Sequence, residues 1–170
     1  MAQWTNSDGL VIRLGTTEAE VTRGGEVSVL GSDRVFEFVV DLANVASSSA
    51  VLEDTQEILI PKNFVVNEVE VFTETAATGT GATLNIGLIQ QDLTTAISTT
   101  ALLAAAPRTD WATAGSKFSY KIGTTGIGAS VGAALANTGY LTAFYSTAAF
   151  TAGRIRVRVI GEVKRPSPSN

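Results

Sequence analysis

Short runs in which apolar and polar residues alternate limit the folds open to this chain more than any other feature. The clearest run is Val35–Leu42, where apolar side chains occupy every second position from Phe36 and the acidic Glu37 and Asp41 fall between them. An alternation of period two predicts a β-strand with one face on a core and one toward solvent. The run therefore predicts a half-buried strand in a β-sheet domain.

Two further pairs of runs predict two hairpins. Residues 64–74 form a long valine-rich run, the loop at 78–81 contains two glycines, and residues 82–90 alternate cleanly. A long run, a glycine-containing loop and a second alternating run are typical of an antiparallel hairpin. Residues 140–146 and 154–163 predict a terminal hairpin by the same argument.

Residues 94–106 predict the one helix of the chain. Apolar residues from Ile97 to Ala105 fall near helical spacing, and Pro107 would end the segment. Threonines within it lower the helix propensity, so the helix is expected to be short.

These segments predict an all-β fold in one domain. A chain of 170 residues suits a single domain, and the segments do not alternate between strands and helices as a parallel sheet requires. We expect an antiparallel β-sandwich or jelly roll of about eight strands with at most one short helix. Residues 1–20 are expected to form an N-terminal arm, residues 21–163 the β-domain and residues 164–170 a flexible tail.

The chain lacks the residues of most reactive centres. It has no histidine and no cysteine, which excludes Ser-His-Asp triads, Cys-His pairs and zinc sites built from these residues. Gly123–Gly128 lacks the Gly-Lys-Ser/Thr ending of a phosphate-binding loop. Three carboxylate pairs have ordinary structural interpretations: Glu53 with Asp54, Glu68 with Glu70, and Asp92 with Asp110. We predict no enzymatic activity, no metal and no cofactor.

Net charge and hydropathy limit the classes of partner that the chain is expected to bind. The net charge is −4, unlike the basic footprint of a nucleic-acid binder. Charged residues make up 16% of the chain, and a weakly charged surface suits contact with other protein. The N-terminus does not resemble a secretory signal and no apolar stretch is long enough to span a membrane. We therefore expect synthesis in a cytoplasm and no binding to nucleic acid or membrane.

Five residues are candidates for contact with a partner. Arg154, Arg156 and Arg158 form a stripe on one strand face. We favour a solvated face paired across strands with Glu68 and Glu70, while the alternative is an anchor for an acidic neighbour. Trp4 either packs on its own core or inserts into a partner, and Arg13 lies in the same arm.

Several segments resemble small structural proteins of tailed phages that infect marine and freshwater bacteria. They are Trp4–Leu10 followed by Arg13–Thr16, then Ile60–Val69, Ala82–Leu88 and Arg156–Val159. The resemblance is to capsid decoration (cement) proteins of the jelly-roll type. It implies a virion protein on the capsid surface, made in the host cytoplasm, that trimerises and binds the major capsid protein. It carries over no functional residue.

Three other functions remain open from the sequence. One is a glycan-binding module of a fibre or spike, for which Trp111, Tyr140 and Tyr145 are the candidate platforms, although Trp111 is better explained as a packing residue. A head–tail or tail component is the second. The third, an enzyme using a carboxylate pair, lacks any supporting motif.

Overall fold

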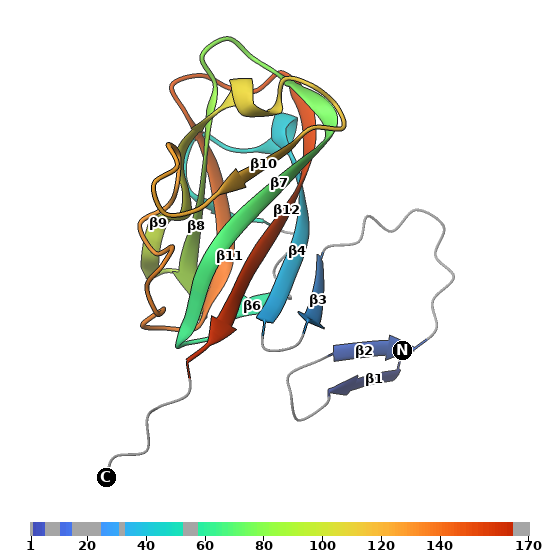
Figure 1. Ribbon diagram of the computed structural model, residues 1–170, viewed down its shortest axis with the longest axis vertical. Coiled ribbons are helices and arrows are strands. Elements are labelled where there is room, and N and C mark those ends of the chain that lie inside the picture. Colours follow the sequence, from blue (N-terminus) through green and yellow to red (C-terminus); the bar gives the residue numbers. More distant parts are fainter. Residues whose placement is uncertain (1, 6–10, 15–24, 31–32, 53–57, 165–170) are drawn as a thin grey trace.

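Two antiparallel sheets form the body of the chain (Figure 1). The computed structural model describes residues 2–5, 11–14, 25–30, 33–52 and 58–164, with side chains from residue 33 onward. The elements are β1 (Ala2–Thr5), β2 (Val11–Leu14), β3 (Gly25–Leu30), β4 (Asp33–Asp41), η1 (Leu42–Asn44), β5 (Ala50–Val51), β6 (Leu59–Ile60), β7 (Phe64–Thr78), β8 (Thr83–Gln90), β9 (Ala96–Pro107), η3 (Arg108–Trp111), β10 (Lys117–Tyr120), β11 (Gly139–Ser146) and β12 (Ala152–Val163). One sheet has the order β10-β7-β12-β4-β3, and the other has the order β5-β11-β8-β9, with β6 also paired to β11.

The strand pairs are nested along the chain. β4 pairs with β12, β5 and β6 pair with β11, β7 pairs with β10, and β8 pairs with β9. Nested antiparallel pairs divided between two sheets are the arrangement of a jelly roll. The predicted fold class is confirmed.

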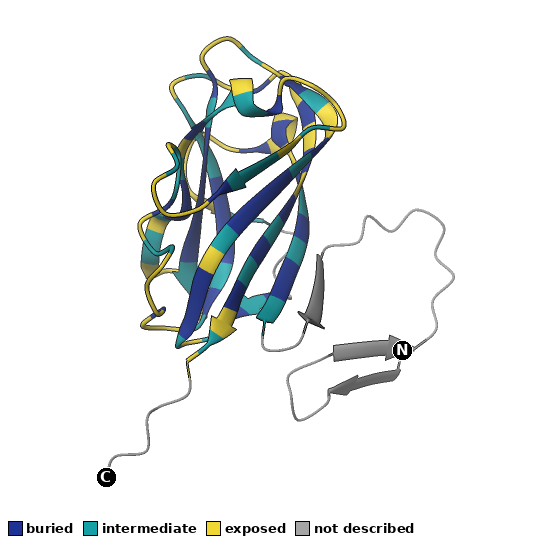
Figure 2. Cartoon of the chain, viewed as in Figure 1, coloured by how far each residue is buried: buried dark blue, intermediate teal, exposed yellow. Residues whose placement is uncertain are grey.

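Alternation along the strands builds the core between the sheets. Phe36, Phe38 and Val40 of β4 are buried, as are the residues of β12 that face them. Buried positions alternate with half-buried or exposed ones along β12 and, from Phe36 onward, along β4 (Figure 2). Apolar side chains at every second position leave water together, which is the main driving force for this layer. The sequence alternation at residues 35–42 thus predicted the face of β4 that is buried.

Neither predicted hairpin exists, because both loops cross between sheets. β7 and β8 follow each other in the chain but belong to different sheets, and β11 and β12 do the same. Alternation shows which face of a strand is apolar, but a strand with one apolar face can join either of the two sheets that cover the core. In both places the next strand joins the opposite sheet, as the nested pairing requires.

The predicted helix is wrong, and residues 96–107 form strand β9 instead. β9 pairs with β8 through several register shifts: Leu84 lies opposite Ala106, Ile86 opposite Leu103 and Leu88 opposite Ser98. Extra residues in a bulge move successive inward side chains out of the period-two pattern. The inward apolar residues of β9 are therefore spaced along the sequence as they would be in a helix.

Residues beyond β10 close one side of the sandwich. Gly128 donates its backbone N–H to Leu102 O of β9 at 2.9 Å, and Gly132 donates to Val66 O of β7 at 2.7 Å. The segment therefore covers backbone at the outer edge of β9 and along β7, edges that would otherwise pair with another chain.

The predicted N-terminal arm and C-terminal tail lie largely outside the described residues. Within the arm, β1 and β2 pair antiparallel, with Trp4 opposite Ile12 and Gln3 opposite Arg13. The boundaries at residues 20 and 164 stay predictions.

Candidate protein-interaction surfaces

The outer face of the sheet that contains β12 carries a network of opposite charges. Arg158 lies opposite Glu37 on β4 and opposite Glu70 on β7, so it stands between two carboxylates across three strands. Arg158 Nε lies 3.2 Å from Glu37 Oε2, and its Nη1 lies 3.4 Å from Glu70 Oε2. Arg154 Nε is 2.9 Å from Glu74 Oε2.

The rest of the network continues along the same face. Arg156 Nε donates to Glu74 Oε1 at 2.8 Å and its Nη1 donates to Glu37 Oε1 at 3.1 Å. These bonds, the one to Glu74 first, raise the pKa of Arg156 above its usual value. Lys117 also pairs with Glu70. We call this set the charge ladder: Glu37, Glu70, Glu74, Lys117, Arg154, Arg156 and Arg158.

The charge ladder agrees with the favoured interpretation of the arginine stripe in part. Glu70 pairs with Arg158 as expected, whereas Glu68 accepts a hydrogen bond from Ser119 and Glu74 and Glu37 are the other partners. All three guanidinium groups are thus ion-paired within the chain. A role for them in binding a partner stays a prediction.

Replacing Arg156 by alanine should lower the free energy of unfolding by no more than about 1 kcal/mol. Its side chain is 46% exposed, and exposed ion pairs contribute about 0–1 kcal/mol because water and salt screen them. Urea titration of R156A, E74A and the double variant would measure the coupling, which should shrink at high salt. A coupling above about 2 kcal/mol would contradict this account of an exposed pair.

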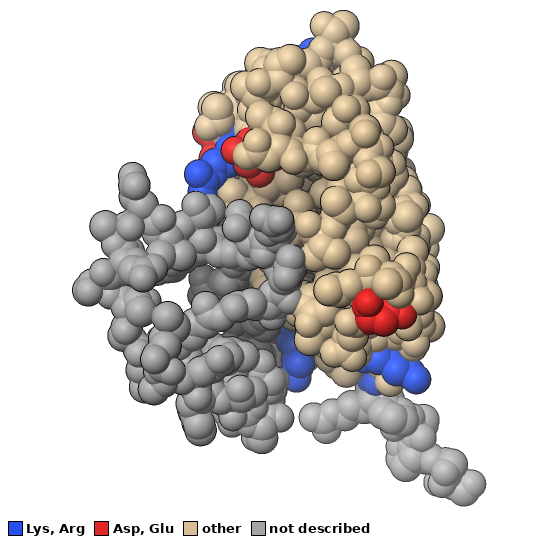
Figure 3. All heavy atoms as spheres, turned by 180° about the vertical axis from the view of Figure 1, so that it is seen from behind, with Lys and Arg blue, Asp and Glu red and all other residues tan. Residues whose placement is uncertain are grey.

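The second sheet contains no charged residue. β5, β6, β8, β9 and β11 have no Asp, Glu, Lys or Arg, and none occurs between Lys121 and Arg154. In Figure 3, which views the molecule from behind, charged atoms of the described residues form a few small groups, and one acidic group lies within the lower part of the surface. We call the outward-facing surface of β5-β11-β8-β9 the neutral face.

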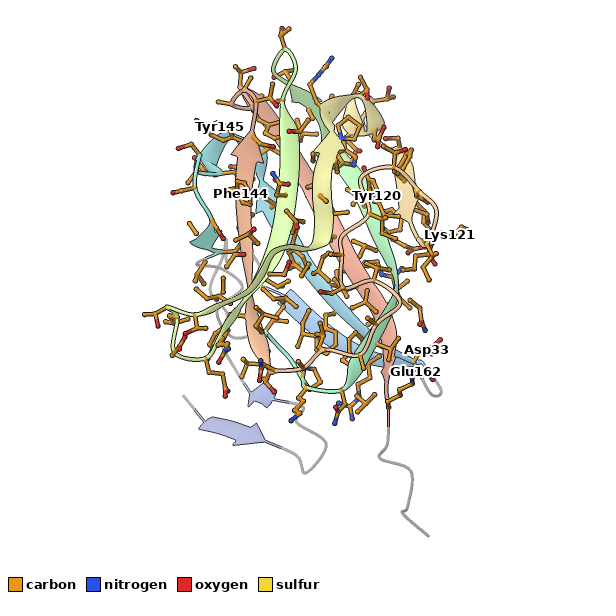
Figure 4. The ribbon with its side chains drawn as sticks, turned by 90° about the vertical axis from the view of Figure 1, so that its left-hand side faces the viewer. Asp33, Tyr120, Lys121, Phe144, Tyr145 and Glu162 are labelled. Carbon is orange, nitrogen blue, oxygen red and sulfur yellow. The ribbon has the colours of Figure 1, made fainter. Side chains whose placement is uncertain are left out.

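Aromatic, aliphatic and hydroxyl groups make up the neutral face. Leu141 and Ala143 of β11 belong to the core, so the alternating Tyr140 and Phe144 point the opposite way. Ile89 of β8 lies opposite Tyr140. All three outward side chains are half-buried, and Figure 4 labels Phe144 on β11. This composition is typical of the buried centre of protein–protein interfaces, where charged residues are depleted.

A bulge of β9 lies directly on this face. Gly87 is flanked by the core residues Ile86 and Leu88, so a Cβ added to it would point outward. That Cβ would lie 2.5 Å from Ser98 O and 2.5 Å from the carbonyl carbon of Thr99. The backbone of Ser98 and Thr99 therefore packs on the outer side of β8, and Thr99 is exposed there.

Asn85 fixes the second bulge of β9. Its Oδ1 accepts the backbone N–H of Ala105 at 2.8 Å, and its Nδ2 donates to Ser146 Oγ at 3.0 Å. Ala105 has φ 49°, in the left-handed region that costs an alanine free energy. The side-chain bond to a buried asparagine compensates for this conformation and gives the neutral face a defined shape.

Trp111 packs in the core and is not available as a glycan platform. It is fully buried, with its ring centroid 6.4 Å from that of Tyr120 and 6.3 Å from that of Phe150. Tyr120 donates its hydroxyl to Asp110 Oδ2 at 2.8 Å. Burial, followed by the Asp110 hydrogen bond and charge, raises the pKa of Tyr120 far above its usual value, against a smaller lowering by Trp111. The two other platform candidates, Tyr140 and Tyr145, are half-buried.

The carboxylates do not converge on a cavity. Asp92 follows β8 and Asp110 follows β9, at opposite ends of β9, while Glu53 and Asp54 lie outside the described residues. A pocket of about 460 Å³ opens between β4, η1 and β5. Asp41 is the one ionisable residue in its described lining, and it accepts the backbone N–H of Ala43 at 3.1 Å.

The described part of the chain holds no group of acidic residues arranged to bind a metal ion. None of its helical segments has the length and hydropathy to cross a membrane.

The structure does not bring the five predicted contact residues together. Arg154, Arg156 and Arg158 belong to the charge ladder, and the side chains of Trp4 and Arg13 lie outside the described residues. Sequence reasoning missed the neutral face as a surface. The charge-free stretches 75–91, 93–107 and 122–153, which contain β8, β9 and β11, were the signal that could have located it.

The chain is similar to a chain of a solved phage structure. No protein-family model matches the chain, and no curated protein is similar in sequence. A chain of the solved "Cyanophage Pam1 capsid asymmetric unit" is 22% identical to it, over 94% of this chain and 98% of that one, with a TM-score of 0.41. A similarity at this level does not assign a function.

Proposed function

We propose that this chain is a structural virion protein that binds the outer surface of a phage head and cements neighbouring capsid subunits. The observation that carries the proposal is the neutral face, a sheet surface without charge on a protein whose other sheet surface is a network of ion pairs. A surface of this kind suits lasting contact with other protein. The phage head is proposed as the binding partner because the sequence resembles decoration proteins.

The neutral face is proposed as the contact between copies of the chain. Each copy has a net charge of −4, so copies repel one another over most surfaces. Neutral faces turned toward one another around a threefold axis bring the uncharged strands of each copy together and cover Tyr140, Phe144 and Ile89. The resemblance to decoration proteins points to a homotrimer bound to the major capsid protein.

The virion role is tested by mass spectrometry of purified virions from the source of this chain. The chain should be present at an abundance near that of the major capsid protein, and heads that lack it should lose DNA at a lower temperature. Its absence from washed virions would contradict the proposal.

Replacing Thr99 by lysine should weaken self-association by about tenfold or more, because a buried unpaired charge costs at least about 1.4 kcal/mol. Sedimentation velocity would compare the wild type, expected at a multiple of the 17.7 kDa chain, with T99K. The matched control is T113K, at an exposed threonine between η3 and β10. A monomeric wild type, or equal behaviour of the two variants, would argue against this contact.

A further inference from the structure

β3 is an open edge of the sheet that carries the charge ladder. It has six residues, Gly25–Leu30, and pairs with β4 on one side. On its other side it pairs with no strand that the structure describes. Its sequence contains neither proline nor lysine, two residues that commonly block pairing at a sheet edge. An open edge of this length can pair with a strand of another chain.

The three other ends of the two sheets differ from β3. β5 has two residues and β10 has four, and very short edge strands are a common protection against pairing. The segment after β10 covers the edge of β9, where Ser130 donates its backbone N–H to Ala101 O at 2.9 Å. Of the sheet edges in the described part of the chain, β3 is therefore the longest that is left uncovered.

The two-stranded sheet of β1 and β2 lacks a third strand. The strands pair with each other from Ala2 opposite Leu14 to Thr5 opposite Val11, and neither pairs with any other described strand. A hairpin of two strands is at best marginally stable in water and becomes stable as part of a larger sheet. The chain thus has a sheet edge that lacks a strand and a hairpin that lacks a sheet.

The hairpin does not pair with the β3 edge of its own chain. β1 and β2 form a sheet separate from that of β3, although β2 directly precedes β3 in the order of strands (Figure 1). Residues 15–24 separate β2 from β3, and a segment of that length extends to at most about 35 Å. This exceeds the diameter of a small domain, roughly 30 Å. The hairpin can therefore reach the β3 edge of a neighbouring copy.

The open edge lies beside the neutral face. Residues of β4 and β5 line one pocket, so β3, the neighbour of β4, is on the side of the sandwich where the neutral face ends in β5. The contact proposed between neutral faces would bring a second copy to this side.

We propose that the β1–β2 hairpin of one copy adds to the β3 edge of the next copy and extends its sheet. Main-chain hydrogen bonds supply the affinity of such strand addition. Around a closed ring, each copy donates one hairpin and receives one. This strand addition goes beyond the proposed function, because it requires no phage head and uses a surface other than the neutral face.

Deleting residues 2–14 separates strand addition from folding of the sandwich. The variant should keep its β-sheet circular dichroism and self-associate about tenfold or more weakly in sedimentation velocity. Its β3 amides should exchange hydrogen about tenfold or more faster, since an uncovered edge opens easily. I12P, which interrupts β2 in the otherwise intact chain, should behave in the same way. The matched control, deletion of residues 165–170, should change neither property.

A mixing experiment shows whether the hairpin acts between copies. The variant that lacks residues 2–14 is labelled with ¹⁵N and mixed with an excess of unlabelled wild type, and protection of its β3 amides should return. If protection does not return, the hairpin covers β3 of its own chain and the proposal is wrong.

The remaining outcomes decide between the two contacts. Unchanged β3 protection in the deletion variant would overturn strand addition, and unchanged self-association would leave the neutral face as the contact, which T99K tests. A monomeric wild type would overturn strand addition and the neutral-face contact together. The virion role would still stand or fall by mass spectrometry of virions.

Discussion

Replacing Trp111 by alanine should lower the free energy of unfolding by about 3–5 kcal/mol, the cost of removing a large aromatic side chain from a packed core. Trp111 is fully buried and lies between the rings of Tyr120 and Phe150. Its removal leaves a cavity among packed core side chains, which can fill it only in part. Chemical denaturation followed by circular dichroism would measure the change.

The matched control is the replacement of Ile122 by alanine. Ile122 is 76% exposed, so its loss should change the free energy of unfolding by less than about 0.5 kcal/mol. A cost for W111A as small as that of I122A would mean that Trp111 lies at the surface. The glycan-platform hypothesis for that residue would then return.

Replacing Gly87 by alanine should cost about 2–3 kcal/mol, although it adds a single methyl group. The added Cβ would lie 2.5 Å from backbone atoms of Ser98 and Thr99, and backbone atoms cannot rotate away as the end of a side chain does. β9 would have to lift off β8. Denaturant titration would measure the loss of stability, and protection of β9 amides from hydrogen exchange should fall with it.

Gly115 provides the control for this substitution. A Cβ there would meet nothing within 4 Å, but its φ of 80° is left-handed. G115A should therefore cost about 1 kcal/mol through backbone strain alone. If G87A costs no more than G115A, the close packing of the β9 bulge on β8 is wrong.

The sequence predicted those parts of the fold that depend on one strand at a time. The alternation in β4 and β12 identified their buried faces, because each strand has a regular pleat and a single apolar side. β9 was missed because its bulges place Leu103 and Ala106 opposite Ile86 and Leu84, three residues apart on one strand and two on the other. No local rule predicts a bulge whose stabilising partner, Asn85, lies on another strand.

The surfaces were harder to predict than the core. Pairing of the arginine stripe required the register of β12 against both β4 and β7, which alternation does not give. The neutral face required knowing that β8, β9 and β11 share a sheet.

The position of β12 has a consequence for synthesis of the protein. β12 is the last strand of the described residues and lies between β4 and β7 in the interior of its sheet. While the chain is being made, β4 and β7 lack the neighbour that joins them and expose unpaired edges. The sandwich therefore cannot close until β12 has left the ribosome, and a product cut short before residue 152 would lack the strand that joins β4 to β7.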